Sequence, residues 1–149
     1  MRAVIQRVKG AKVKVENETI NEIDKGFLVL LGVEEDDTDK DLEYICNKTI
    51  GLRIFEDENK NMNLSLADVG GEILAISQFT LYGDARKGRR PSFIKAARPE
   101  KANPLYEKFL EKCNNKGIKT YGGVFGAHME IELINDGPVT IILDSSKIL

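Results

Sequence analysis

Short apolar segments of strand length recur along most of the chain, separated by polar residues. Residues 26–33 form a continuous apolar run, which indicates a strand buried on both faces. Elsewhere apolar and polar positions alternate, most clearly over residues 127–134, as they do in a half-buried strand. The predicted strands comprise residues 2–8, 11–16, 19–24, 26–33, 52–55, 73–82, 127–134 and 139–143.

Two segments instead carry apolar residues at helical spacing. Thr38 can cap the first helix, whose apolar stripe begins at Leu42. Asn103 and Pro104 suit the cap and first turn of the second helix, and Gly117 suits its end. The sequence therefore predicts two main amphipathic helices.

Strands and helices do not alternate regularly, so the pattern predicts an α+β fold with a largely antiparallel, barrel-like sheet. There is no repeat, low-complexity tract or linker, and residues 1–149 are predicted to form a single domain. No apolar run approaches the roughly 20 residues of a membrane span, and the N-terminus becomes polar too early for a signal peptide. We therefore expect a cytoplasmic protein with no membrane partner.

Cys46 and Cys113 each lie among apolar residues at helical spacing. Buried free thiols are favoured over a disulfide bond between them. The one histidine, His128, has no cluster of cysteines or further histidines to join, so no zinc site is expected. No other metal-ligand pattern is visible, and neither a metal nor a cofactor is predicted.

The formal net charge is −2, but the basic residues are concentrated in two blocks. Residues 1–15 carry five basic and no acidic residues, and residues 86–101 carry seven basic residues and one acid. Such blocks on a mildly acidic chain indicate a face that binds a polyanion, although a solvated charged surface gives the same pattern. The second block falls in a predicted long loop, residues 83–101, and long loops are often functional.

The segment 73–82 changes from apolar to polar halfway along its length. An edge strand with polar residues facing water gives this pattern, and so does a strand that leaves the core and enters a cleft. Four consecutive residues there place two hydroxyls and an amide beside one aromatic ring. They are Ser77, Gln78, Phe79 and Thr80.

A second unusual segment, residues 135–140, lies between two predicted strands. Its Asn-Asp-Gly-Pro start is typical of a turn. However, Gly137 would let another molecule approach the backbone closely, and Pro138 fixes φ and removes a donor. A cis bond between them would redirect the carbonyls, although only about 5–6% of X-Pro bonds are cis in folded proteins.

Together, Ser-Gln-Phe-Thr-Leu at 77–81 and Asn-Asp-Gly-Pro-Val-Thr at 135–140 resemble the signature pair of the D-aminoacyl-tRNA deacylases. The family usually has Phe-Gly-Ala-Asp-Met where residues 125–129 carry His128 in place of the aspartate. On strand alternation, His128 is expected to point away from the face that carries its neighbours Ala127 and Met129. The resemblance covers essentially the whole chain, and it also includes residues 5–8, 28–33, 51–55 and 88–93.

The resemblance implies a homodimer that hydrolyses the ester between a D-amino acid and the terminal ribose of tRNA, and also glycyl-tRNA mischarged on tRNA(Ala). It implies active sites at the dimer interface, where a cis Gly137-Pro138 of one subunit enters beside residues 77–80 of the other. Arg7 matches the arginine that braces this dipeptide. Ala102 and Met129 match positions that line the pocket.

A rigid piece of main chain, here called the wedge, can select between mirror-image esters by blocking one direction at Cα. The D and L esters differ only by exchanging hydrogen and side chain at Cα. Once the α-amino group and the ester are held, rigid carbonyls of Gly137 and Pro138 can leave room for hydrogen but not for an L side chain. This exclusion would act on any amino acid. Glycine, which is achiral, would not be excluded.

Ester hydrolysis also requires an attacking water and a stabilised oxyanion. The backbone N–H groups of Phe79 and Thr80 are our candidates for the stabilising donors. Thr80 has the hydroxyl of a nucleophile, but its motif has no histidine or lysine to act as the base. We favour a positioning role for Thr80 over a covalent one, and the neighbouring ribose hydroxyl of the tRNA is a candidate to activate the water.

The basic loop is expected to contact phosphates of the tRNA acceptor stem. Two other classes of protein stay open: a non-catalytic tRNA-binding or RNA-binding module, and a structural dimer joined through apolar strands. The RNA-binding module gives no reason for a Gly-Pro pair beside a hydroxyl-rich strand, and the structural dimer leaves the basic loop unexplained. The expected phosphate contacts are Arg86, Lys87, Arg89 and Arg90, the last of which could equally be an ion-pair partner.

Overall fold

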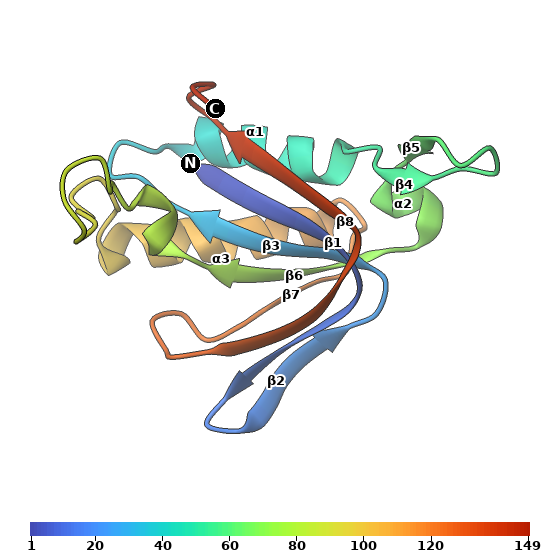
Figure 1. Ribbon diagram of the computed structural model, residues 1–149, viewed down its shortest axis with the longest axis horizontal. Coiled ribbons are helices and arrows are strands. Elements are labelled where there is room, and N and C mark those ends of the chain that lie inside the picture. Colours follow the sequence, from blue (N-terminus) through green and yellow to red (C-terminus); the bar gives the residue numbers. More distant parts are fainter.

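The structure, a computed structural model that describes residues 1–149, contains one main sheet of six strands (Figure 1). These strands are β1 (Arg2–Val15), β2 (Glu18–Ile23), β3 (Gly26–Gly32), β6 (Glu72–Ser77), β7 (Thr120–Gly122) and β8 (Glu130–Asp144). The strand order is β2-β1-β3-β6-β7, and β8 also pairs with β1, so the sheet curves and nearly closes. Strands paired with β1 are antiparallel, whereas β3–β6 and β6–β7 are parallel.

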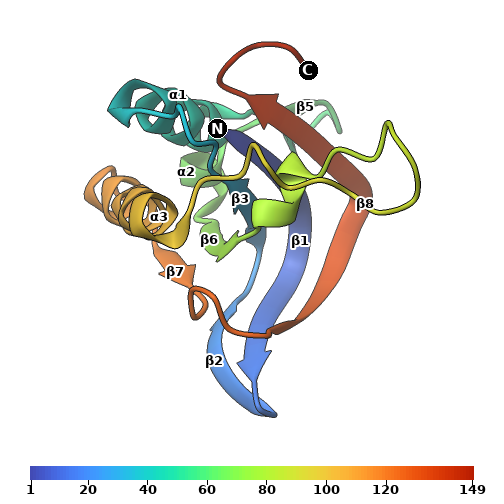
Figure 2. The same ribbon diagram turned by 90° about the vertical axis from the view of Figure 1, so that its left-hand side faces the viewer.

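Two long helices lie side by side on one face of this sheet, and β8 lies on the opposite side (Figure 2). The prediction of an α+β fold with a largely antiparallel, barrel-like sheet and two main helices is confirmed. None of the helices combines the length and apolar character that a membrane crossing requires. The remaining elements are α1 (Asp39–Gly51), α3 (Pro99–Asn115), the short helix α2 (Leu66–Val69), the 3₁₀ turn η1 (Phe79–Tyr82), and the two-stranded sheet of β4 (Phe55–Glu56) and β5 (Met62–Leu64).

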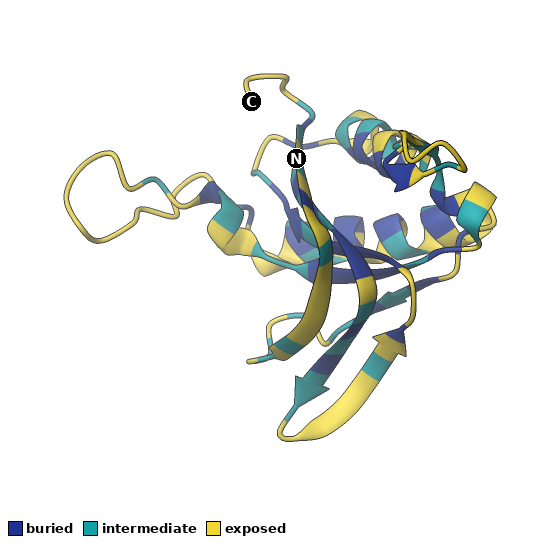
Figure 3. Cartoon of the chain, turned by 45° about the vertical axis from the view of Figure 1, so that its right-hand side comes forward, coloured by how far each residue is buried: buried dark blue, intermediate teal, exposed yellow.

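The main core lies between the helices and the sheet. Phe27 of β3 and Phe109 of α3 are fully buried there, and the Phe27 ring stacks on Phe55 with centroids 5.2 Å apart. Cys46 of α1 and Cys113 of α3 meet in the same core with their Sγ atoms 3.4 Å apart, and both thiols are free, as predicted. Outside this core, most of β2, much of β8 and the loop after η1 are exposed (Figure 3).

The start of α1 agrees with the prediction, because the Thr38 side chain caps it and accepts a hydrogen bond from the Lys40 N–H. The start of α3 does not agree. Pro99 occupies the first turn of α3, where proline is favoured, and Pro104 lies inside the helix. The loop predicted for residues 83–101 therefore ends at Arg98.

The predicted strands 2–8 and 11–16 are parts of a single strand, β1. The pairing of β1 with β8 shifts register between Gln6 and Val8 and again between Val8 and Gly10. Such irregularities interrupt the alternation of side chains without ending the strand. The sequence pattern therefore suggested a break where the structure has a distortion.

The same explanation applies to β8, which continues through the segment read as a turn. Residues 135–138 lie inside β8, so the interpretation of that segment as a turn between two strands is wrong. The Gly137-Pro138 peptide bond is cis, and Gly137 has φ of 130°. The predicted strand 127–134 begins only at Glu130.

The predicted strand 73–82 also ends early, because β6 stops at Ser77. The N–H of Gln78 donates to the carbonyl of Leu31 at 2.8 Å, one residue beyond the strand. The chain then enters η1, where the N–H of Leu81 donates back to the Gln78 carbonyl at 3.2 Å. The polar half of the segment is thus a turn that leaves the sheet, rather than an edge strand. The predicted strand 52–55 is also shorter in the structure, because only Phe55 of these four residues belongs to a strand, β4.

Candidate active site

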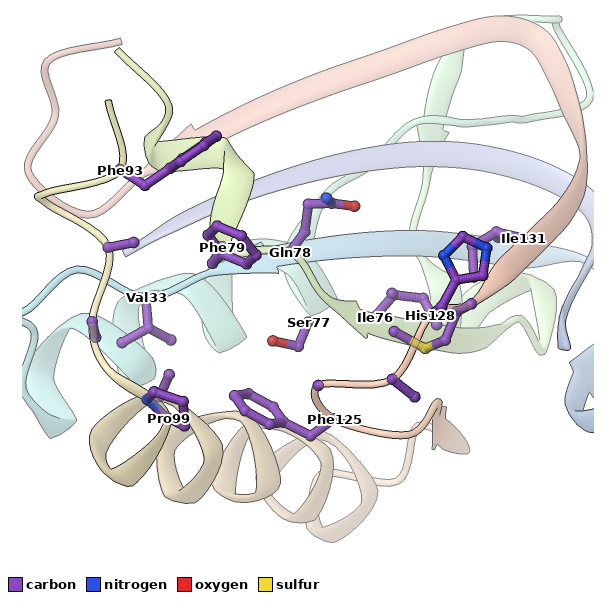
Figure 4. Close-up of a pocket in the computed structure, with 16 residues that line it drawn as sticks. Val33, Ile76, Ser77, Gln78, Phe79, Phe93, Pro99, Phe125, His128 and Ile131 are labelled. Carbon is purple, nitrogen blue, oxygen red and sulfur yellow. The ribbon is translucent and has the colours of Figure 1, made fainter. Parts of the chain in front are cut away.

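A pocket of about 540 Å³ opens where β6 ends and η1 begins (Figure 4). Sixteen residues line it, and eleven of them are hydrophobic. The N-terminal part of α3 forms a second wall, and the segment that leads into β8 forms a third. Residues that line these walls include Ser77, Gln78 and Phe79 on the first, Pro99 and Ala102 on the second, and Phe125, His128 and Met129 on the third.

Three of the four predicted catalytic residues, Ser77, Gln78 and Phe79, line the pocket, whereas Thr80 does not. The Thr80 side chain lies beside them, since Nε2 of Gln78 donates to Oγ1 of Thr80 at 2.5 Å. The Thr80 oxygen is thus an acceptor, and no basic group is placed to take its proton. This arrangement can orient a polar group at the mouth of the pocket.

Backbone donors are present at the same place. The hydrogen bonds of η1 begin with the N–H of Leu81, so the earlier N–H groups of Phe79 and Thr80 have no acceptor within the turn. Arg2 fixes the far end of the turn, because its Nη1 donates to the carbonyl of Leu81 at 3.0 Å and its guanidinium lies 4.6 Å from the centre of the Tyr82 ring. The turn is therefore anchored while its first two amides stay available.

An aromatic pair forms the rim of the pocket. The Phe79 side chain is 55% exposed, and its ring meets the ring of Phe93 edge to face with centroids 5.2 Å apart (Figure 4). Phe93 and Phe125 were not among the predicted site residues. Each lies in a segment that carries the family resemblance, 88–93 and 125–129. The resemblance could therefore have identified both residues, but neither was predicted to line the pocket.

Ala102 and Met129, the two residues predicted to line a pocket, both lie in the wall of this one. Ala127 and Met129 are half-buried and His128 is exposed, as alternation predicts, yet His128 also lines the pocket at the end beside Ile131 (Figure 4). All three residues precede β8, which begins at Glu130. His128 is the one ionisable side chain in the lining.

The Gly137-Pro138 dipeptide does not line the pocket of its own chain. Both residues are exposed, and Arg7 holds the backbone just before them. The buried Arg7 side chain donates from Nε to the carbonyl of Asp136 at 3.0 Å and from Nη1 to the carbonyl of Ile54 at 2.7 Å. The dipeptide is therefore presented outward from a fixed support.

The four predicted phosphate contacts lie on the exposed loop between η1 and α3. Arg86 is engaged within the loop, because its Nε and Nη2 donate to the Asp84 carboxylate at 2.9 and 2.6 Å. This bidentate contact holds the pKa of Asp84 well below its usual value. Lys87, Arg89 and Arg90 are exposed and form no ion pair. No group of three or more histidine, cysteine or acidic side chains is placed to hold a metal ion.

Comparisons with known proteins show the family to which the chain belongs. The sequence matches the family described as D-Tyr-tRNA(Tyr) deacylase over residues 4–144. It is 63% identical to a D-aminoacyl-tRNA deacylase of Clostridioides difficile and 59% identical to one of Thermosipho africanus, in each case over 99% of both chains.

Solved structures show the same fold. A c-Myc DNA unwinding element binding protein superimposes with a TM-score of 0.92 at 44% identity, covering 97% of this chain and 98% of that one. A probable eukaryotic D-amino acid tRNA deacylase superimposes with a TM-score of 0.82 at 19% identity, covering 95% and 97%. On the sequence match over its whole length, the chain belongs to the D-Tyr-tRNA(Tyr) deacylase family, whose members are hydrolases that cleave the ester bond of D-aminoacyl-tRNA.

Proposed function

We propose that the pocket beside η1 receives the aminoacyl end of the tRNA and that a second copy of the chain completes it. The observation that carries this proposal is the position of Gly137-Pro138, which is exposed, braced by Arg7 and absent from the lining of its own pocket. A wedge in this position can act only on a neighbouring molecule. The active unit is then a homodimer with its sites at the interface.

Selection between mirror-image esters follows from the backbone of the wedge. With the α-amino group and the ester held by residues 77–80, one direction at Cα faces the carbonyls of Gly137 and Pro138. Hydrogen fits in that direction and an L side chain does not, so D-aminoacyl groups are hydrolysed whatever their side chain. Glycyl-tRNA mischarged on tRNA(Ala) has hydrogen in both directions and is also a substrate. The apolar lining supplies space for the D side chain.

Hydrolysis proceeds by attack of water on the ester carbonyl, after which the bond between the carbonyl carbon and the ribose oxygen breaks and releases the free D-amino acid and the tRNA with its ribose hydroxyl restored. The N–H groups of Phe79 and Thr80 donate to the oxyanion, and donors fixed before the reaction stabilise a developing charge most effectively. Thr80 positions the reacting groups and receives a hydrogen bond from Gln78. The ribose hydroxyl next to the ester activates the water, which accounts for a site with so few acid or base side chains.

The exposed basic loop binds acceptor-stem phosphates without reading the sequence. Lys87, Arg89 and Arg90 supply these contacts, whereas Arg86 is already paired with Asp84. Free aminoacyl-tRNA in the cytoplasm is the expected partner.

A deacylation assay with D-Tyr-tRNA, L-Tyr-tRNA and Gly-tRNA(Ala) in parallel tests the proposal. We expect hydrolysis of the first and third and protection of the second. A non-catalytic RNA-binding module, the alternative function, would bind all three and hydrolyse none. Equal hydrolysis of both tyrosyl esters would contradict chiral exclusion while leaving the esterase activity intact. Sedimentation of the active fraction as a monomer would contradict completion by a second copy.

A further inference from the structure

Tyr106 of α3 lies directly behind the pocket without lining it. The side chain is buried, and its hydroxyl donates to the carbonyl of Ala75 at 2.6 Å and accepts from the N–H of Gly123 at 3.1 Å. A Cβ added to Gly122 would lie 2.5 Å from this hydroxyl, so the neighbouring glycine leaves just the room that the phenol needs. One hydroxyl thus joins a helix, a strand and the segment after β7.

These contacts occur where two strands separate. The parallel pairing of β6 with β7 ends at Ala75 and Gly122, and no ladder hydrogen bonds join the chains beyond that pair. The pocket opens from this fork, since Ser77 follows on one branch and Phe125 on the other. The Tyr106 hydroxyl bridges the two branches at the base of the fork.

The Tyr106 ring extends the same support to the pocket wall. Its centroid lies 6.1 Å from that of Phe125, which lines the pocket. Burial raises the pKa of Tyr106 to about 12, so the phenol remains protonated at neutral pH and keeps its donor for Ala75. Helix α3 itself contributes Pro99 and Ala102 to the lining. Tyr106 is therefore connected to all three walls.

We propose that Tyr106 is a positioning residue for ester hydrolysis, whose hydroxyl sets the separation between the wall of residues 77–79 and the wall of residues 125–129. The inference rests on the proposal that this pocket is the active site. A shift of about 1 Å in the position of the catalytic groups can lower the rate on the order of 100-fold. Without the Tyr106 hydroxyl, the two chain segments that separate after Ala75 and Gly122 are free to shift in this way.

The test is Tyr106→Phe, which removes the hydroxyl and keeps the ring. We expect kcat for D-Tyr-tRNA to fall by about 10-fold or more, with KM changed by less than about threefold, because the Tyr106 hydroxyl contacts none of the residues proposed to bind phosphate. The thermal midpoint should fall by only a few degrees. The pH dependence of kcat should keep its shape, since the hydroxyl positions groups and transfers no proton. Tyr44→Phe is the matched control, because the Tyr44 hydroxyl on α1 makes no hydrogen bond, and it should behave as wild type.

A second variant separates this inference from the proposed site. Met129→Trp fills the pocket and should abolish hydrolysis without unfolding the protein. If Met129→Trp is inactive while Tyr106→Phe retains wild-type kcat, the positioning role is wrong and the site stands. If folded Met129→Trp remains fully active, the pocket is not the active site and both proposals fail. A loss of rate in Tyr106→Phe that is matched by an equal loss of folded protein would also overturn the positioning role.

Discussion

Gly137 lies so close to Arg7 that a Cβ added to the glycine would sit 2.9 Å from Nη2 of the guanidinium. The same Cβ would lie 2.7 Å from the side chain of Val139. The positive φ of Gly137 is a conformation that L residues rarely adopt. Arg7 cannot move aside freely, because two backbone carbonyls hold it. The support and the exposed dipeptide therefore form one rigid unit.

Gly137→Ala should disturb this unit. The added methyl group must displace either the Arg7 guanidinium or the dipeptide, so we expect hydrolysis of L-Tyr-tRNA to rise by at least about 10-fold relative to D-Tyr-tRNA. The ratio of the two rates is the measurement. Gly117→Ala is the control, since Gly117 also has a positive φ but has open space where a Cβ would lie. The Gly117→Ala variant should be destabilised by backbone strain and should still reject the L substrate. If both variants lose this rejection equally, a general loss of stability is responsible rather than a displaced Gly137-Pro138.

Arg7→Lys should weaken the support and keep the charge. The planar guanidinium of Arg7 donates to the carbonyls of Asp136 and Ile54 from two different nitrogens, and the single ammonium group of lysine cannot reproduce this arrangement. A buried carbonyl left without a donor costs about 1–3 kcal/mol. We expect a fall of this size in the free energy of unfolding, measured with urea, together with reduced preference for D-Tyr-tRNA. A variant that loses stability but discriminates as well as wild type would show that Arg7 is structural only.

Thr80→Ala should reduce kcat without abolishing it. The Thr80 oxygen accepts a hydrogen bond from Gln78 and faces no base, which suits positioning rather than covalent attack. We expect at least about 1% of the wild-type kcat to remain, since a misplacement of the reacting groups by about 1 Å costs on the order of 100-fold. Thr80→Ser, which keeps the hydroxyl, should stay close to wild type. Rapid quenching with mass spectrometry checks for an acyl-enzyme, and a trapped ester on Thr80 would reverse this assignment.

Particular elements show which parts of this fold can be predicted from local sequence. The Thr38 cap and the apolar stripe of α1 depend on residues within one or two turns, and both were predicted. The end of β6 was not predicted, because it depends on contacts with distant parts of the chain. The Leu31 carbonyl accepts a hydrogen bond from the Gln78 N–H, and the Arg2 side chain anchors η1. The continuity of β8 past Pro138 likewise depends on pairing with β1.

The candidate site divides in the same way. Ser77, Gln78 and Phe79 are adjacent in sequence, so a motif was enough to bring them together. Tyr106 carries no such signal, since its role depends on Ala75 and Gly123, which only the folded sheet places beside it. The place of His128 in the pocket lining was not predicted, because it depends on how the segment before β8 folds against the rest of the chain.

Neutralising the basic loop should weaken tRNA binding uniformly. Replacing Lys87, Arg89 and Arg90 with glutamine removes three exposed cations that have no internal partner, and the slope of log affinity against log salt should fall by about 1 for each cation that binds a phosphate. KM should rise while kcat at saturation is retained. Arg86→Gln should have less effect, because Arg86 is paired with Asp84. Lys119→Gln, an exposed lysine after α3, is the control. An unchanged salt slope in the triple variant would exclude this loop as the phosphate-binding element.

Acid stability should depend on Glu43, which connects α1 to α3. Its carboxylate accepts hydrogen bonds from Nζ of Lys112 at 2.8 Å and Nζ of Lys116 at 3.2 Å, and these contacts, with one from Asn47, lower the pKa of Glu43 to about 2. A carboxyl group whose pKa is lowered on folding stabilises the native state above the unfolded pKa, and this stabilisation is lost as pH falls through the folded pKa.

For Glu43 that window runs from about pH 4.5 down to about pH 2. Glu43→Gln should therefore lower the thermal midpoint by about 1–2 °C at pH 7, as expected of an exposed ion pair, and the difference from wild type should shrink below about pH 4.5 and vanish only below about pH 2. Glu58→Gln, at an exposed position without an ion pair, is the control and should leave the midpoint unchanged at pH 7. A difference between Glu43→Gln and wild type that persists undiminished at pH 2 would mean that the Glu43 side chain stabilises the helix pair by packing rather than by its charge.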